Sequence, residues 1–231
     1  MLISITNRKL TNGDFLKKID EIAKGNPYKI ILREKDLDKN DYSNLLNQII
    51  PITNKYNADL AIHSHIDIAK SHNIKSIHLP FNQFKENYEN YKNYKNYENY
   101  ENYENINNSS KTYNKHLNKL KYFDTVGVSI HSIEEAVYAE NNGANYIIAG
   151  HIFPTKSKKG LKERGLKFLE DLKFATKIDI YAIGGININN LDSVLKTGVK
   201  GIAIMSDLMQ SNTPYQKILD YKNQLEKGEN K

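Results

Sequence analysis

The feature that most constrains this chain is a repeated alternation of short apolar runs with stretches of helical spacing. The eight apolar runs are Leu2–Thr6, Tyr28–Arg33, Ala58–His63, Ile74–Leu79, Val126–His131, Tyr146–His151, Ile178–Ile186 and Gly201–Ser206. Apolar strands that alternate with amphipathic helices are typical of a parallel sheet covered by helices. Eight such units without a ninth predict an α/β fold closed into a (β/α)8 TIM barrel, and a doubly wound open sheet is the weaker alternative.

Length and composition narrow the classes further. The chain has 231 residues, close to the roughly 250 residues of a typical (β/α)8 barrel, so we expect a single barrel domain over residues 1–231. It contains no cysteine, which excludes disulfides and thiol catalysis and leaves histidine and carboxylates as transition-metal ligands. No apolar run approaches the length of a membrane span, and the first residues lack the pattern of a signal peptide. We therefore expect a cytoplasmic protein without a membrane partner.

The formal charge of +6 suits an anionic ligand, either a nucleic acid or a small phosphate. Lysine is scattered along the whole chain, which is typical of an ordinary solvated surface. We expect the protein to bind a small molecule and no nucleic acid. The sequence does not decide whether it forms a homo-oligomer.

Residues 85–110 form a low-complexity insertion rich in Asn and Tyr. Within it, Asn87 to Glu104 is six tandem triplets of Asn, Tyr and Glu or Lys. Residues that repeat every three positions do not stay on one face of an α-helix, and apart from tyrosine this repeat contains no apolar side chain. We therefore expect the insertion to be exposed and partly disordered. Its tyrosines could stack on RNA bases, but repeat slippage tolerated in a surface loop is the preferred interpretation. The fourth helix is then expected between Lys111 and Tyr122.

Two helix starts carry capping signals. Ser132 followed three residues later by Glu135 predicts a capping box. Asn187 and Asn189 are suited to cap the helix that runs through Leu191.

Paired glycines predict a phosphate site. Gly184 and Gly185 stand at the end of the seventh apolar run, and Ser206 ends the eighth. Glycines before a helix let backbone N–H groups approach an anion closely, and the loops after strands seven and eight commonly hold phosphate in barrels. The alternative is that the glycines serve only a tight turn.

The loop after the sixth run is expected to close over a phosphorylated ligand. It carries hydroxyl and cationic side chains at Thr155, Ser157, Lys158 and Lys159, which suit phosphate without any need for a metal.

Polar residues that end the other runs are the remaining candidates, since barrel active sites lie at the carboxyl ends of the strands. His151 is the predicted acid/base, because an imidazole with a pKa of about 6.5 can take and return a proton at neutral pH. A core histidine bonded to a carbonyl is the alternative. Arg33 and Lys35 are predicted substrate ligands after the second run, whereas His131 is expected to be structural.

Six segments resemble the thiamine-phosphate-synthase/TenI family. They are Leu32-Arg-Glu-Lys35, Gly127-Val-Ser-Ile-His-Ser132, Gly143-Ala-Asn-Tyr146, Gly150-His-Ile-Phe-Pro-Thr155, Ala182-Ile-Gly-Gly-Ile186 and Gly198–Ser206. The resemblance spans nearly the whole chain apart from the insertion. It implies a barrel enzyme of thiamine biosynthesis.

The family has two branches. Synthases join a pyrimidine diphosphate to a thiazole phosphate with magnesium held by carboxylates, whereas TenI-like members isomerise a thiazole phosphate. At the matching positions this chain has Ser64 and Gln83, both neutral, and His63 stands where both branches usually have Asn. The Gly150-His151 pair is similar to the TenI branch, although Pro154–Lys158 stays close to the synthase loop.

The TenI resemblance implies a metal-independent tautomerase that aromatises a carboxylated dihydrothiazole phosphate. In it His151 moves the protons, the glycine pair with Ser206 holds the phosphate, and Arg33 or the lysines of residues 156–159 hold the carboxylate. No cofactor is expected. The alternatives are a magnesium-dependent thiamine-phosphate synthase and a non-catalytic regulatory or RNA-binding barrel.

Overall fold

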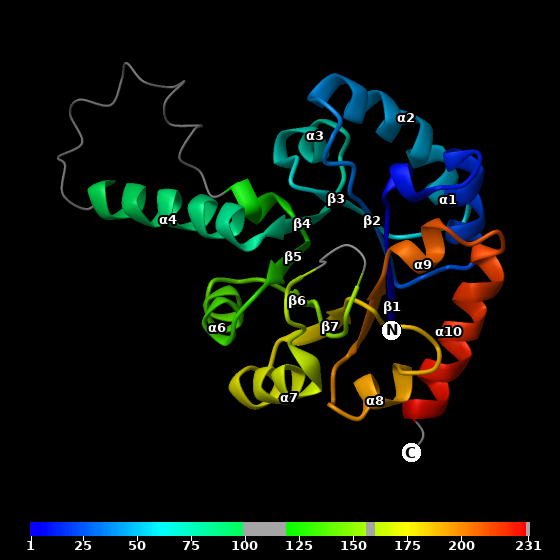
Figure 1. The fold of residues 1–231 in the computed structure, drawn as a ribbon. Coiled ribbons are helices and arrows are strands. Elements are labelled where there is room, and N and C mark those ends of the chain that lie inside the picture. The colour runs from blue at the N-terminus through cyan, green and yellow to red at the C-terminus, as the bar shows by residue number, and fades with distance from the viewer. Residues whose placement is uncertain (99–118, 156–159, 230–231) are drawn as a thin grey trace.

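The computed structural model of the chain is a closed barrel of eight parallel strands surrounded by helices (Figure 1). It describes residues 1–98, 119–155 and 160–229. The strands are β1 (Leu2–Ile5), β2 (Lys29–Leu32), β3 (Leu60–His63), β4 (Ser76–Pro80), β5 (Thr125–Ile130), β6 (Tyr146–Gly150), β7 (Asp179–Ile183) and β8 (Gly201–Ile204). They pair in sequence order, and β1 pairs with β8 to close the ring. The predicted (β/α)8 barrel is confirmed, and the open sheet is excluded.

Helices cover the outer face of the barrel. They are α1 (Phe15–Lys24), α2 (Lys39–Lys55), α3 (Ile66–Ser71), α4 (Phe81–Glu98), α6 (Ile133–Asn141), α7 (Gly165–Ala175), α8 (Leu191–Leu195), α9 (Ser206–Met209) and α10 (Pro214–Glu229), with short 3-10 helices η1 (Arg8–Leu10) and η3 (Lys119–Tyr122). Across the residues that the structure describes, none of the helices combines the length and apolar character needed to cross a membrane.

Side chains alternate between two cores, because successive residues of a strand point to opposite faces. The large core lies between the strands and the helices. A smaller core fills the barrel interior and consists of Ile3, Ile5, Ile31, Ala61, Tyr146, Ile148, Tyr181 and Ala203. The same inward alternation continues past the carboxyl ends of the strands, where it places polar side chains above this inner core.

One predicted helix cap is confirmed and the other is wrong. Ser132 Oγ accepts a hydrogen bond from the N–H of Glu135 at 3.2 Å, as predicted for the start of α6. At α8 the N-cap residue is Asn190 instead of Asn187 or Asn189. The chain first turns at Asn187, whose side chain accepts from the N–H of Asn189 at 2.9 Å, so the helix begins later than the sequence suggested.

The fourth helix precedes the position expected for it. It is α4, which leaves β4 directly and extends away from the barrel (Figure 1). Buried Phe84 and the contact of Tyr88 with Tyr138, ring centroids 6.3 Å apart, give its first turns an apolar anchor. In the segment 111–122, the described residues form only η3. The rest of that segment lies outside the described residues. Of the 85–110 insertion, residues 85–98 belong to α4 and are helical, and residues 99–110 lie outside the described residues.

Candidate active site

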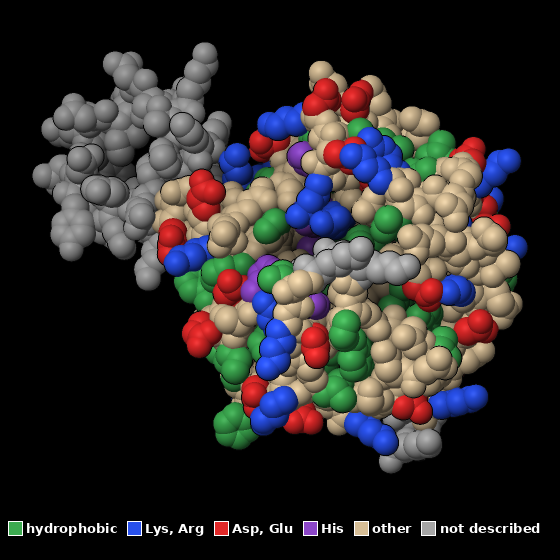
Figure 2. Space-filling view, viewed as in Figure 1, with side chains coloured by type: hydrophobic (Ala, Val, Ile, Leu, Met, Phe, Trp, Pro, Cys, Tyr) green, Lys and Arg blue, Asp and Glu red, His purple; other side chains and the backbone are tan. Residues whose placement is uncertain are grey.

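A cavity of about 850 Å³ opens at the carboxyl ends of the strands, and all eight strands contribute to its wall. Basic and histidine side chains gather around this hollow in the space-filling view (Figure 2). Among the lining residues Asp207 is the one acid. Its carboxylate forms an ion pair with the Lys217 ammonium and accepts a hydrogen bond from the Tyr221 hydroxyl at 2.8 Å. The cavity therefore suits an anionic ligand.

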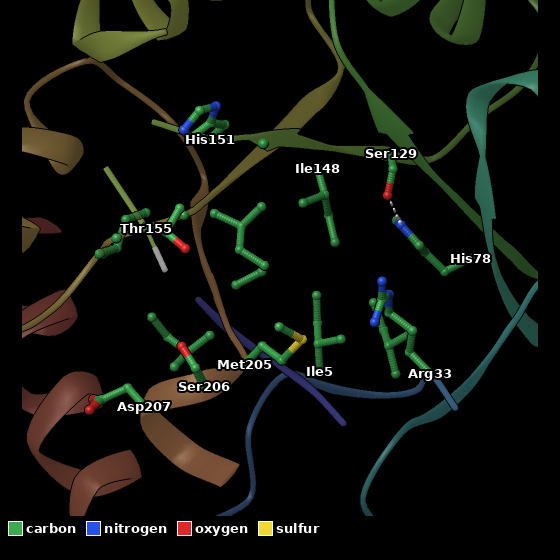
Figure 3. A pocket seen from close by; sticks show the side chains of 18 of the residues that line it. Ile5, Arg33, His78, Ser129, Ile148, His151, Thr155, Met205, Ser206 and Asp207 are labelled. Atoms are coloured by element: carbon green, nitrogen blue, oxygen red, sulfur yellow. Dashed lines mark hydrogen bonds between the residues drawn. The ribbon is translucent and has the colours of Figure 1, made fainter. Parts of the chain in front are cut away.

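The structure brings most of the predicted site residues into this one cavity (Figure 3). Those that line it are Arg33, Lys35, His151, Thr155, Gly184, Gly185 and Ser206. The other three, Ser157, Lys158 and Lys159, lie outside the described residues. Their predicted closure over a ligand stays a prediction.

His151 stands directly after β6 in an unusual backbone conformation. Its φ is +64°, in the left-handed region that few non-glycine residues adopt. The side chain is buried, with 4% of the residue exposed, and Nε2 has no hydrogen-bond partner among the described residues. A buried nitrogen without a partner costs roughly 1–3 kcal/mol. Strained and unsatisfied residues of this kind cluster at functional sites, and His151 lines the cavity, so it is the strongest candidate for a functional residue.

The turn that carries His151 is held by the start of α7. The backbone N–H of Arg164 donates to the carbonyl of His151 at 2.9 Å. The Arg164 guanidinium donates to the carbonyls of Gly150, at 2.9 Å, and His131, at 3.1 Å. Arg164 thus ties the ends of β5 and β6, and the turn after β6, to the start of α7. Arg164 was not among the predicted site residues, because it does not end an apolar run and no sequence signal distinguishes it from other arginines.

The predicted glycine pair has a packing role of its own. A Cβ on Gly184 would lie 2.8 Å from His151 Cα, and one on Gly185 would lie 2.6 Å from the carbonyl oxygen of Pro154. Both residues have positive φ values, +109° and +67°. The side-chain amide of Asn190 donates to the Gly185 carbonyl at 2.9 Å and fixes the loop. The tight turn that was the alternative to a phosphate site is therefore real, and phosphate binding there stays a prediction.

Two cations face the cavity at its other end. Burial lowers the pKa of Arg33, and it lowers the pKa of Lys35 together with repulsion from Arg33. Among the described residues, the Arg33 guanidinium has neither a hydrogen bond nor an ion pair. Glu34 between them is buried and accepts from Thr6 Oγ1 at 2.6 Å and from the Arg8 N–H at 2.9 Å. Glu34 is structural, whereas Arg33 and Lys35 are open to a ligand.

Two buried histidines, His63 and His78, lie beside Arg33. His78 was not among the predicted site residues. Burial lowers the pKa of His63 to about 2 and that of His78 to about 3. His78 donates to or accepts from Ser129 Oγ at 2.8 Å. His78 and Ser129 both line the cavity from mid-strand positions. Every second residue of a strand points into the barrel, and this alternation along β4 and β5 identifies both His78 and Ser129. A search restricted to the ends of the strands does not include them.

The neutral positions Ser64 and Gln83 form a closed network. Gln83 Nε2 donates to the Ser64 carbonyl at 2.7 Å, and Ser64 Oγ is 2.8 Å from His63 Nδ1. Magnesium prefers carboxylate oxygens and water, and these groups supply no carboxylate. Among the described residues no group of three or more His, Asp or Glu is arranged to hold a metal ion. Among the described residues, the positions of Ser64 and Gln83 therefore offer no carboxylate to the magnesium that the synthase branch uses.

The fold and the cavity together define a (β/α)8 barrel with a cationic ligand site at the carboxyl ends of its strands. A comparison with family models matches residues 2–89 and 110–208 to the family described as thiamine monophosphate synthase. The chain belongs to this family, known as thiamine-phosphate synthase/TenI, whose members are enzymes of thiamine biosynthesis.

Named relatives agree with the family match. The chain is 33% identical over 220 residues to the thiamine-phosphate synthase of Clostridium acetobutylicum, covering 95% of this chain and 90% of the relative. It is 31% identical over 210 residues to the thiamine-phosphate synthase of Clostridium tetani, covering 90% and 87%. A solved structure, thiamine phosphate pyrophosphorylase from Pyrococcus furiosus, is similar with a TM-score of 0.72 and 26% identity, covering 98% of this chain and 96% of that one.

Proposed function

We propose that this chain is a thiazole tautomerase of thiamine biosynthesis that works without a metal. The observation that carries the proposal is the buried His151 imidazole, whose Nε2 lacks a partner among the described residues at the wall of a cationic cavity. A proton-transfer reaction needs one such group and no redox or metal chemistry. The ligand class is a carboxylated dihydrothiazole phosphate.

In this reaction the His151 imidazole takes the proton from the ring carbon that bears the carboxylate. The electron pair that is released moves through the ring, and the exocyclic alkylidene carbon takes up a proton from the resulting imidazolium. One imidazole serves both steps if it reaches both carbons, and the gain in aromaticity drives the equilibrium. The phosphate would lie against Gly185 and Ser206, and the carboxylate would lie toward Arg33.

The second candidate is a thiamine-phosphate synthase, and the comparisons favour it over the tautomerase. Relatives with 31% and 33% identity carry that name. Thr155 of the Pro-Thr loop also lines the cavity. Against this candidate stands the neutral network of Ser64 and Gln83, which offers no carboxylate to the magnesium that a synthase needs.

Incubation with the dihydrothiazole phosphate, with and without magnesium, separates the two functions. We expect aromatic absorbance to develop equally in both samples and in EDTA. His151→Gln should lose roughly 10²–10⁴-fold in kcat, the usual contribution of a general acid/base, while the substrate still binds. Magnesium-dependent joining of a pyrimidine diphosphate to a thiazole phosphate, abolished by EDTA, would establish the synthase instead. Unchanged turnover in His151→Gln would rule out the proposed role of this residue.

A further inference from the structure

Three side chains form a hydrogen-bonded row at the floor of the cavity. The Tyr146 hydroxyl lies 3.2 Å from His78 Nδ1, and His78 Nε2 lies 2.8 Å from Ser129 Oγ. Tyr146 is buried in the inner core, whereas His78 and Ser129 line the cavity (Figure 3). The row therefore connects the inner core to the ligand site.

The direction of the first hydrogen bond follows from the surroundings of Tyr146. Burial raises the pKa of the phenol well above its usual value, so the hydroxyl keeps its hydrogen. Among the described residues, His78 Nδ1 is the one partner of this hydroxyl. Gly127 leaves the space for the ring, since a Cβ there would lie 2.1 Å from Tyr146 Cζ. Tyr146 thus donates, and His78 Nδ1 accepts.

The state of His78 then fixes the second hydrogen bond. Burial, with the charges of Lys29 and Arg33, lowers the pKa of His78 to about 3, so the ring is neutral at physiological pH. A neutral imidazole has one N–H and one acceptor nitrogen. Because Nδ1 accepts, the hydrogen is on Nε2, and it donates to Ser129 Oγ.

The opposite arrangement is less favourable. If Nδ1–H donated to Tyr146, the phenolic hydrogen would have no acceptor among the described residues. An unsatisfied buried donor costs roughly 1–3 kcal/mol. The row therefore has one preferred direction, from Tyr146 toward the cavity.

We propose that Tyr146 and His78 act as a positioning pair that makes the Ser129 hydroxyl a hydrogen-bond donor to the ligand, and that Ser129 and Arg33 together form a carboxylate subsite. Ser129 accepts from His78, so its own hydrogen is left for a group in the cavity. Arg33 lies at the same end (Figure 3). Among the described residues its guanidinium makes no hydrogen bond or ion pair, because the neighbouring Glu34 is bonded to Thr6 and to the Arg8 N–H. A donor beside a guanidinium selects an anionic oxygen. The identity of that oxygen as the ring carboxylate rests on the proposed function.

The ring nitrogens of His78 can be observed directly in the full-length protein. In ¹⁵N-labelled protein without ligand, we expect the His78 signals to show hydrogen on Nε2 and an unprotonated Nδ1. The signals are assigned by their disappearance in His78→Gln. Hydrogen on Nδ1, or a charged ring at neutral pH, would overturn the direction of the row.

A matched pair of ligands tests the carboxylate subsite. The probes are the aromatic thiazole phosphate with its carboxylate and the same compound without it. Ser129→Ala should weaken binding of the carboxylated compound by roughly tenfold, as expected for a hydrogen bond to a charged group, and leave the other compound unchanged. Tyr146→Phe should weaken the same compound by a smaller factor, roughly threefold. Tyr181→Phe is the control, because that hydroxyl contacts Met1 Sδ at 3.3 Å instead of the row.

The two proposals can fail separately. Absence of turnover with a preserved difference between the two probes would remove the tautomerase and keep the subsite. Normal turnover, lost in His151→Gln, combined with equal effects of Ser129→Ala on both probes would remove the subsite alone. Failure of the wild-type protein to prefer the carboxylated probe would also contradict it.

Discussion

The barrel interior holds one buried cation that is paired and one that is not, at opposite ends of the strands. Lys29 begins β2 and Arg33 follows it four positions later, so both point toward the barrel interior. The Lys29 ammonium, with 1% of the side chain exposed, pairs with Asp59 and donates to Ser76 Oγ at 2.7 Å. Arg33 has no such partner among the described residues and lines the cavity instead. A paired charge in this interior belongs to the scaffold, whereas an unpaired one is available to a ligand.

The largest expected effect is on ligand binding at the unpaired end. Arg33→Met keeps much of the apolar stem and removes the charge. Losing one partner of a close charge pair costs roughly 2–5 kcal/mol, so affinity for the carboxylated thiazole phosphate should fall about thirtyfold or more. Titration calorimetry measures this change. The midpoint of urea unfolding should stay the same or rise, because the substitution removes a desolvated charge, and a large loss of stability would contradict the comparison.

The reciprocal change at the paired end should affect stability and leave binding intact. Asp59→Ala leaves the Lys29 ammonium buried, with the Ser76 hydroxyl as its hydrogen-bond partner and the Tyr28 ring 5.7 Å away, and with no counter-charge among the described residues. Removing one member of a buried pair costs roughly 3–5 kcal/mol. The Asp59 side chain is 47% exposed, so we expect a smaller loss of about 2–3 kcal/mol in the free energy of unfolding. Lys29→Met is the matched variant and should cost less, since Asp59 can then turn to water. Ligand affinity that fell along with stability would show that the two ends are coupled.

Between the two ends, buried neutral histidines should make stability depend on pH. His78 has a folded pKa of about 3, below the value of about 6.5 in an unfolded chain. Between these values the unfolded state binds more protons, so the free energy of unfolding decreases as the pH falls. Each such histidine contributes a slope that approaches about 1.4 kcal/mol per pH unit. His63, with a folded pKa of about 2, adds to it in the same direction.

Urea unfolding between about pH 6 and pH 5 measures this slope above the range where carboxylates titrate. His78→Gln should reduce the slope by nearly one proton while keeping polar groups toward Ser129. An equal slope in wild type and His78→Gln would mean that His78 is protonated in the folded protein.

The barrel could be predicted from the sequence because its signal is repeated eight times along the chain. Short errors in single strands, such as the end of β7 at Ile183 instead of Ile186, do not change the count. The helices that depend on one local feature were harder to predict. Asn190 replaces Asn187 and Asn189 at the start of α8 because a preceding turn delays the helix, and α4 depends on Phe84, which lies before the repeat.

Cavity residues could be predicted where their position at the end of a strand is enough to place them in the cavity, as for Arg33 and His151. His78 and Ser129 lie within their strands, and only the alternation of inward and outward positions marks them. Arg164 could not be predicted at all. Its contacts join the ends of β5 and β6 with the start of α7, and such contacts depend on how three segments distant in sequence meet.

The smallest expected effect concerns the support of His151 by Arg164. Arg164→Lys keeps the positive charge and the backbone N–H bond to His151, but loses the planar fork that holds the carbonyls of Gly150 and His131. With the turn less firmly held, kcat should fall about threefold to tenfold while KM changes little, since catalytic geometry is sensitive to small displacements. Unfolding free energy should change by less than about 1 kcal/mol because the residue is partly exposed.

A double-mutant comparison separates positioning from a general loss of stability. In the His151→Gln background, Arg164→Lys should leave the residual rate unchanged, because residues that act through one another are not additive. Lys167→Ala on the same helix is the control, since its pair with Asp171 at 2.7 Å lies on the exposed surface. If Arg164→Lys lowers the rate equally in both backgrounds, the guanidinium acts independently of His151, and the two clamped strand ends serve only the barrel.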